Sequence, residues 1–113
     1  MLTEELKRQL VERLRAINPY KIILFGSYSQ GTASNDSDID LLVVTEDNFF
    51  PNTFAEKNAI YLHVADTIVE IEKKIPIDLI VHTKAMYRKF IELGGMFARQ
   101  IGAKGIILYE KTD

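Results

Sequence analysis

Three aspartates set in strand-like apolar sequence are the feature that most constrains the fold of this chain. Asp38 and Asp40 precede the apolar run Leu41 to Val44, and Asp78 lies within a second apolar segment, 77–81. Aspartate is depleted in strands and is costly to bury without a partner. Because side chains alternate along a strand, Asp38 and Asp40 should point to the same face. If the two strands are neighbours, three carboxylates converge there and need a positive counter-charge.

A divalent cation would supply that counter-charge. Magnesium is bound by a few carboxylates together with phosphate oxygens of a substrate, which suits an acidic trio of this kind. A single aspartate at a strand end is more often a turn former or an ion-pair partner. Asp36 is assigned that turn role, because it lies inside the sequence Asn35-Asp36-Ser37. The pair Asp38 and Asp40 together with Asp78 is harder to explain structurally, and it predicts a metal site.

A glycine-serine pair follows the first predicted strand, Ile22 to Phe25. Gly26 permits a phosphate to approach the backbone closely. The Ser27 hydroxyl and the N–H groups of a following helical turn can donate hydrogen bonds to an anion. The P-loop and dinucleotide-binding glycine patterns are absent, and most Gly-Ser pairs are simple turns, so the pair alone is a weak signal. The neighbouring Tyr28 could equally stack on a base or pack with its hydroxyl bonded to the backbone.

Taken together, the segments Phe25 to Gly31 and Asp36 to Val44 resemble the signature of the nucleotidyltransferase superfamily that includes DNA polymerase β. That signature is a strand, Gly-Ser, a spacer (here Tyr28 to Ser37) and Asp-apolar-Asp. The third carboxylate of the family lies on a later strand, where Asp78 matches it. The short length, the leading helix and the ending 105–110 are similar to the minimal nucleotidyltransferases. The resemblance covers nearly the whole chain and implies a polymerase β-like nucleotidyltransferase fold.

The resemblance also implies a role for each matching position. Asp38 and Asp40 would hold two magnesium ions, while Asp78 would complete one metal site and help to deprotonate the attacking hydroxyl. Attack at the α-phosphate of an NTP would release pyrophosphate. The nucleotide-binding candidates are Gly26, Ser27 and Ser37.

One position departs from the family pattern. Members of the group often carry arginine where this chain has Gln30. A cation near the phosphates stabilises the charge that develops there, so its absence would weaken or alter nucleotide binding. Lys84 and Arg88 are the residues suggested to supply the missing cation instead.

The minimal family is commonly encoded beside a helical partner, the HEPN protein, in toxin–antitoxin pairs. Some members transfer AMP from ATP to a tyrosine of that partner and thereby act as antitoxins. The resemblance therefore implies a magnesium-dependent, ATP-using adenylyltransferase that modifies a HEPN partner and forms a homo- or hetero-oligomer. Two alternatives stay open. The chain could neutralise its partner by contact alone, or it could modify a small molecule such as an aminoglycoside.

Strand and helix patterns alternate along the chain, which predicts an α/β (α+β) fold with a small mixed sheet flanked by helices. Thr3 and Thr83 are predicted helix N-caps, and 1–113 is predicted to be a single domain. The predicted helices are 4–17, 60–75 and 84–93, with a last helical turn at 97–101. The predicted strands are 22–25, 38–44, 77–81 and 106–109.

Composition limits the kinds of site, partner and cellular location that are expected. The chain has no cysteines, so disulfides and thiolate metal sites are impossible. A net charge of −2 gives no general attraction to nucleic acid, and no DNA partner is expected. The apolar runs are too short for a membrane span, and the acidic start is unlike a secretory signal, so a cytoplasmic protein is expected.

The remaining aromatic residues and histidines are assigned structural roles. His63 and His82 are expected to be satisfied structural residues rather than ligands. Phe49, Phe50 and Phe54 cluster around a polar loop. We expect them to fold back onto the core, the alternative being an apolar contact for a partner.

Overall fold

The computed structural model describes residues 3–34 and 37–112, so the turn role predicted for Asp36 lies outside the described residues. In this part of the chain, four strands form one mixed sheet in the order β3-β2-β1-β4. Strand β1 is antiparallel to both of its neighbours, whereas β2 and β3 are parallel. The strands are β1 (Lys21–Phe25), β2 (Ile39–Val44), β3 (Ile77–His82) and β4 (Ile106–Glu110).

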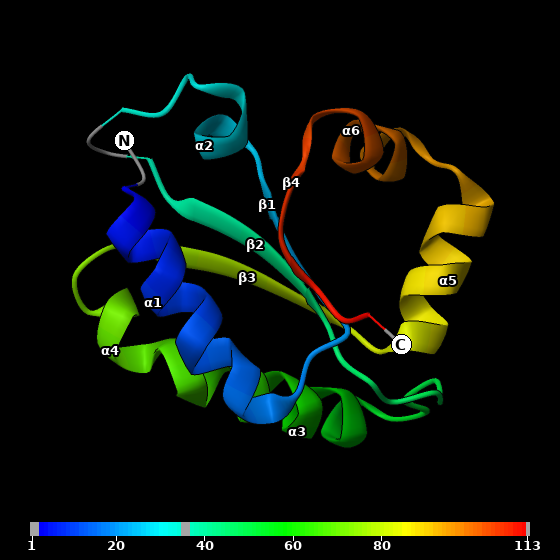
Figure 1. Ribbon diagram of the computed structural model, residues 1–113. Helices are drawn as coiled ribbons and strands as arrows, with labels where there is room; N and C mark the ends of the chain where they lie inside the picture. The colour runs from blue at the N-terminus through cyan, green and yellow to red at the C-terminus, as the bar shows by residue number, and fades with distance from the viewer. Residues whose placement is uncertain (1–2, 35–36, 113) are drawn as a thin grey trace.

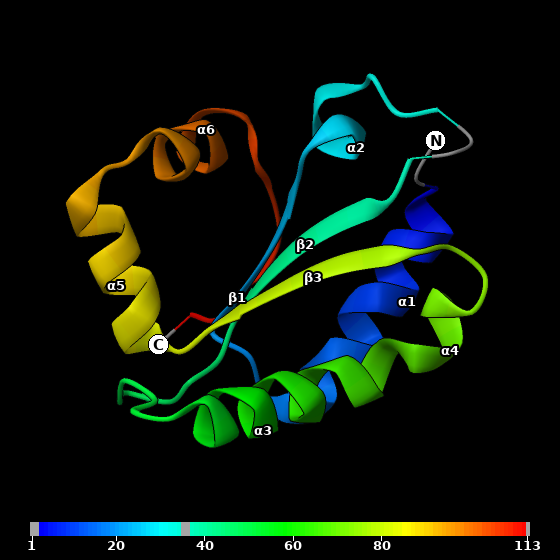
Figure 2. The same cartoon turned by 180° about the vertical axis from the view of Figure 1, so that it is seen from behind.

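Helices cover both faces of this sheet (Figure 1). One face carries α1 (Glu4–Leu14), α3 (Phe54–Ala65) and α4 (Val69–Glu72), with the 3-10 turns η1 (Arg15–Ile17) and η2 (Asp66–Ile68). The other face carries α5 (Lys84–Leu93) and α6 (Met96–Lys104). The short helix α2 (Ser27–Gln30) lies at the end of β1, and Figure 2 shows it beside α6 at the same end of the sheet. The expected mixed sheet flanked by helices is confirmed.

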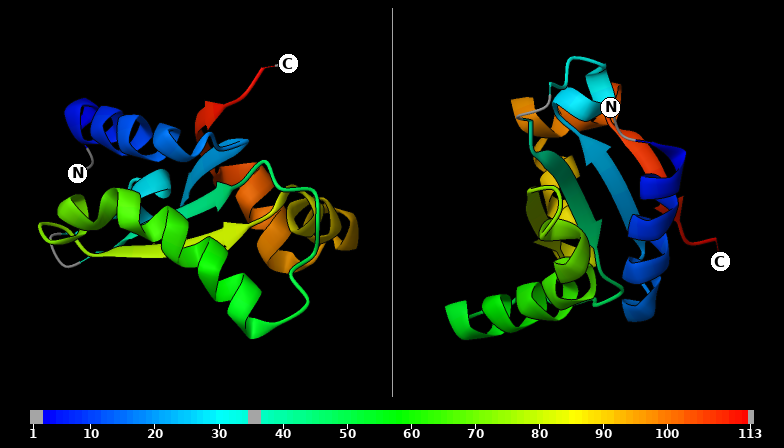
Figure 3. Two further views of the ribbon diagram at one scale, coloured as in Figure 1. Left: turned by 90° about the horizontal axis from the view of Figure 1, so that it is seen from below. Right: turned by 90° about the vertical axis from the view of Figure 1, so that its left-hand side faces the viewer.

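The two faces of the sheet have separate cores (Figure 3). The larger core joins α1 and the α3–α4 region to alternate residues of the strands, such as Leu24 and Leu41. The smaller core joins Ile101 of α6 to the opposite set, which includes Ile23 and Leu42. Since β1 and β2 are covered on both sides, they read as continuous apolar runs, as the sequence indicated.

The predicted helix caps are confirmed. Thr3 Oγ1 accepts a hydrogen bond from the Leu6 N–H at 3.1 Å. Thr83 Oγ1 accepts one from the Met86 N–H at 3.1 Å. Each cap satisfies a backbone donor that has no partner within its helix. The first helix also ends as predicted, with Asn18 in the left-handed region at φ 53° before Pro19.

The predicted helix 60–75 differs from the observed one in two ways. It begins earlier, at Phe54, because the Thr53 side chain accepts the Glu56 N–H at 3.1 Å and caps it. It is then interrupted at η2, where the Thr67 hydroxyl donates to the Val64 carbonyl at 2.8 Å. Such side-chain bonds to a nearby carbonyl compete with the helical hydrogen-bond pattern.

The predicted turn at 97–101 is a full helix, α6. Gly94, with φ 59°, ends α5, and Gly95 is the N-cap of α6. The glycine pair therefore interrupts the helical region as predicted, and the segment after it is longer than a single turn.

The expectation that the phenylalanines of the loop fold back onto the core is wrong. Phe49, Phe50 and Phe54 are 47%, 51% and 80% exposed. Among the residues of α3, the buried one is Val64, near its C-terminal end. The start of α3 and the preceding loop thus extend beyond the core, which leaves these rings without a surface to pack on. Within 3–34 and 37–112, no helix is long and apolar enough to cross a membrane.

Candidate active site

Two of the predicted acidic residues face each other across the parallel pair of strands. Asp40 of β2 and Asp78 of β3 are register partners. By alternation, Asp40 shares its face with Leu42, and Asp78 shares its face with Ile80, which both belong to the smaller core. The pair therefore lies on the α5–α6 face, at the end of the sheet where β2 and β3 begin.

The third carboxylate, Asp38, lies immediately before β2, which begins at Ile39 rather than at the predicted position 38. It is exposed, as is Asp78, whereas Asp40 is partly buried. Burial raises the pKa of Asp40 above its ordinary value of 3.8, and the charges of Asp78 and Asp38 raise it further. A hydrogen bond with Asp78 acts in the same direction. The rise in pKa shows that the three carboxylates act on one another.

The glycine-serine loop is pressed against this acidic group. Gly26 follows Phe25, the register partner of Asp40. A Cβ at Gly26 would overlap Oδ2 of Asp40 and would lie 3.0 Å from its Cγ. Gly26 also has φ 75°, a left-handed conformation that favours glycine. Both observations require glycine here, because the Asp40 carboxylate occupies the space that a side chain would need.

The remaining loop candidates lie close by. Ser27 is the first residue of α2. The Ser37 hydroxyl accepts a hydrogen bond from the Ser34 N–H at 2.9 Å, so it shapes the loop that leads to Asp38. The Tyr28 ring packs against the larger core, and its hydroxyl donates to the Ser37 carbonyl at 3.4 Å. Of the two roles considered for Tyr28, the contacts favour packing.

The donor set at this site suits magnesium, since hard carboxylate oxygens meet a backbone cradle open to phosphate. Across 3–34 and 37–112, however, no three acidic or histidine side chains are already gathered into a metal cage. The residues therefore fit a cation that arrives together with phosphate oxygens, rather than a site enclosed by protein alone.

This arrangement can be compared with known proteins. The family model described as "Nucleotidyltransferase domain" matches residues 4–108. The chain belongs to this family. The nucleotidyltransferase activity implied by the family resemblance is thereby confirmed.

Individual relatives of this nucleotidyltransferase agree with the family. It is 31% identical over 91 residues to "Putative protein adenylyltransferase MJ0604" of Methanocaldococcus jannaschii, covering 79% of this chain and 77% of the relative. A solved toxin–antitoxin structure with AMP-PNP contains a chain with a TM-score of 0.62 and 24% identity, covering 94% of this chain and 74% of that one. A complex of an AMPylated Shewanella oneidensis HEPN toxin with an MNT antitoxin gives a TM-score of 0.53 and 20% identity, covering 93% and 70%.

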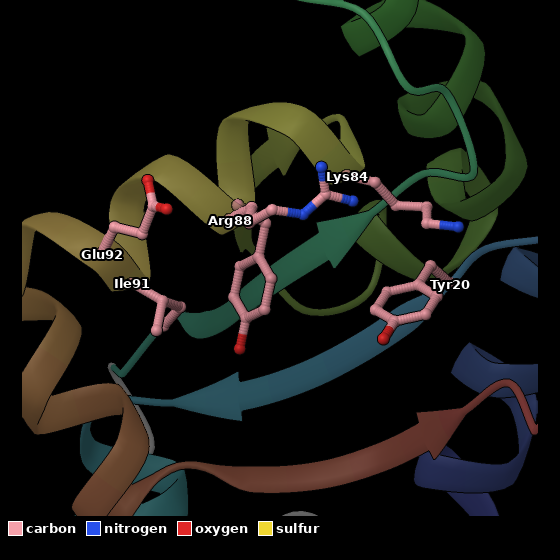
Figure 4. A pocket seen from close by; sticks show the side chains of 6 residues that line it. Tyr20, Lys84, Arg88, Ile91 and Glu92 are labelled. Carbon is pink, nitrogen blue, oxygen red and sulfur yellow. The ribbon is translucent and has the colours of Figure 1, made fainter.

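The two basic residues suggested to supply the cation that Gln30 lacks lie away from the glycine loop of this nucleotidyltransferase. Lys84 and Arg88 line a pocket of about 290 Å³ with Tyr20, just before β1 (Figure 4). Lys84 also pairs with Glu46 at 3.5 Å. Since Tyr20 precedes β1 and Gly26 follows it, the whole strand, about 16 Å long, separates this pocket from the glycine loop. The suggestion is therefore wrong for this structure.

Sequence reasoning missed a different set of residues beside the glycine loop. A pocket of about 210 Å³ is lined by α6 and by the loop. Its lining residues include Gly26, Ser29 and Gln30 from the loop, and Phe97, Gln100 and Lys104 from α6. Helical spacing at positions 97, 100, 101 and 104 was the available signal, but the sequence was read as a single turn there.

The two histidines take no part in this site. His63 is exposed on α3. The His82 ring packs edge-on against Phe90 at 5.1 Å, and its Nδ1 is buried without a hydrogen-bond partner among the described residues. Burial lowers the pKa of His82 below 6.5, and the charge of Lys57 lowers it further. His82 is structural, as expected, although it is not fully satisfied.

Proposed function

We propose that this nucleotidyltransferase transfers AMP from ATP to a hydroxyl of a helical HEPN-type partner and acts as its antitoxin. The observation that carries the proposal is the Asp40–Asp78 register pair, with Gly26 packed directly against Asp40. A glycine cradle and paired carboxylates together suit the transfer of a nucleotide from a triphosphate. Neither feature alone would select that chemistry.

The choice of ATP and of a protein acceptor is supported by the relatives. The Methanocaldococcus jannaschii relative is named as an adenylyltransferase that acts on protein. Two of the structural neighbours are toxin–antitoxin structures, one with AMP-PNP and one with an AMPylated HEPN toxin. We extend these properties to this chain as part of the proposal.

Asp38, Asp40 and Asp78 would hold magnesium. When bound, magnesium neutralises phosphate charge and stabilises the attacking and leaving oxygens of an in-line displacement. The Gly26 backbone would approach the phosphates beside Asp40, and the Ser27 hydroxyl would donate to a phosphate oxygen. The exposed carboxylate of Asp78 is accessible to an incoming hydroxyl and would accept its proton.

The acceptor would come from outside the chain. Asp38 and Asp78 are exposed, so the acidic group opens toward solvent rather than into an enclosed substrate chamber. A partner whose hydroxyl is presented on a rigid helix would reach these carboxylates without large rearrangement. The partner would therefore complete the site that this domain leaves open.

The test is to purify the chain with its cellular partners and incubate the mixture with magnesium and α-labelled ATP. Mass spectrometry of the products should show the mass of an AMP group added to the partner protein. Asp38→Asn and Asp40→Asn should abolish the transfer. The exposed Asp66→Asn on η2 is the matched control and should transfer as well as wild type.

Three results would contradict the proposal. Transfer that persists in Asp38→Asn and Asp40→Asn would remove the carboxylates from the mechanism. Partner neutralisation by wild type and Asp40→Asn alike, with no nucleotide transferred, would favour a contact-only antitoxin. Label found on a small molecule and on no protein would point to an aminoglycoside-type acceptor.

A further inference from the structure

We infer that Lys104 of α6 binds the terminal phosphates of the ATP and supplies the positive charge that Gln30 lacks. This inference rests on the proposed function and assigns a phosphate-binding residue to the same site. Its basis is the 210 Å³ pocket in which the glycine loop and α6 face each other. Figure 1 and Figure 2 both show α2 and α6 next to each other at this end of the sheet.

The charges around the loop create the need for a cation. The Asp40 carboxylate lies against Gly26, its register partner Asp78 adds a second acidic group, and a bound triphosphate would add further negative charge. The loop residues that line the pocket, Gly26, Ser29 and Gln30, are all uncharged. A cation must therefore come from another element, and Lys104 is the charged residue in the lining of this pocket.

The lysine is free to perform this role. Within 3–34 and 37–112, Lys104 forms no ion pair, whereas Lys21, Lys84 and Lys111 pair with glutamates at the other end of β1. Lys104 is exposed and lines this open pocket, so a ligand there can reach it. Lysine commonly binds phosphate as a point charge without the fixed geometry that arginine requires.

The packing of α6 against β1 fixes the position of Lys104. Phe97 of α6 packs edge-on against Phe25 at 5.3 Å, which holds the helix over the end of β1. Phe97, Gln100, Ile101 and Lys104 repeat at helical spacing, so one stripe of α6 faces the loop. At Gly105 a Cβ would lie 3.0 Å from Cγ2 of Ile23, so the chain after Lys104 is pressed onto β1.

The alternative is that Lys104 only stabilises the structure, and the experiment must distinguish this role from phosphate binding. A lysine in the last turn of a helix also interacts favourably with the helix dipole. Arg99 is the control for the loss of a positive charge from α6 as such, because it is an exposed cation on this helix that lies outside the pocket lining. Gln30→Arg provides a second test, since it would return a cation to the loop without touching α6.

The experiment measures the dissociation constant of magnesium-ATP by calorimetry for the full chain. Lys104→Ala should weaken binding by about 10- to 100-fold, the usual worth of a hydrogen bond to a charged group. Arg99→Ala should stay within about twofold of wild type, and Gln30→Arg in the Lys104→Ala background should restore most of the affinity. Lys104→Arg should bind nearly as well as wild type. If the alanine variant does not fold, Lys104→Gln replaces it.

The inference is overturned if Lys104→Ala weakens ATP binding no more than Arg99→Ala does. It is also overturned if the Lys104→Ala protein folds normally, binds weakly, and is not rescued by Gln30→Arg. Failure of the proposed function gives a different result. In that case wild type binds magnesium-ATP in a Lys104-dependent manner but transfers nothing to a partner. A wild-type chain that binds no magnesium-ATP would overturn both.

Discussion

Asp40 and Asp78 face each other as register partners across β2 and β3, and burial together with the charge of Asp78 raises the pKa of Asp40. The site therefore places like charges side by side in a protein without bound metal. Such an arrangement lowers stability locally and is kept for its chemistry. Variants at this site should therefore change stability and nucleotide transfer in different ways.

Replacing Asp40 should stabilise the metal-free protein while abolishing transfer. The native pKa of Asp40 lies above its ordinary value of 3.8, so wild type loses stability as the pH rises through that native pKa. Asp40→Asn carries no charge and avoids this loss. Thermal melting at pH 7 with EDTA should therefore give a higher Tm for Asp40→Asn than for wild type. Asp66→Asn should show no such gain, and an equal or lower Tm for Asp40→Asn would contradict the prediction.

Adding a methyl group at Gly26 should disable the site. Its Cβ would overlap the Asp40 carboxylate, and φ 75° is unfavourable for alanine. We expect Gly26→Ala to reduce transfer on the order of a hundredfold, because a displacement of about 1 Å at a reacting group has that effect. Gly102→Ala is the matched control, since nothing lies within 4 Å of the added Cβ and the residue is inside α6. It should keep activity and stabilise by roughly 0.5–1 kcal/mol.

The buried His82 should make the protein sensitive to mild acid. Its native pKa is lower than 6.5, so below pH 6.5 the unfolded chain takes up a proton that the folded chain does not. Stability should fall as the pH drops from 6.5 toward the native pKa. His82→Phe keeps an aromatic ring against Phe90 and should flatten this part of the curve. Denaturant unfolding between pH 7 and pH 5 measures it, with exposed His63→Gln expected to behave as wild type.

Core and exposed apolar residues should differ sharply in their effect on stability. Leu24 is fully buried between β-strands and helices, so Leu24→Ala should cost about 2–5 kcal/mol in unfolding free energy. Phe54 is 80% exposed, and Phe54→Ser should stay within about 0.5 kcal/mol of wild type. Urea unfolding of both variants tests this. A large loss in Phe54→Ser would mean that this ring packs on the core after all.

Much of the fold followed from local sequence. Thr3 and Thr83 correctly predicted where two helices start. An N-cap is a local feature, because it needs only one side-chain oxygen and an N–H group three residues later. The apolar runs predicted β1 and β2 because strands covered on both faces are hydrophobic throughout. The glycine pair Gly94 and Gly95 predicted an interruption between two helical segments, which is confirmed, but the turn predicted at 97–101 is too short, because α6 runs from Met96 to Lys104.

For the site, the sequence by itself determined which residues are proposed to carry the chemistry: the Gly-Ser pair, the Asp-apolar-Asp spacing and a third strand aspartate. Only the tertiary structure decided how they meet. Register placed Asp78 opposite Asp40, packing placed Gly26 against Asp40, and the return of α6 placed Lys104 beside the loop while Lys84 went to the far end of β1. Spacing along a chain sets the direction of side chains within one element, but the distance between elements depends on how strands pair and helices pack.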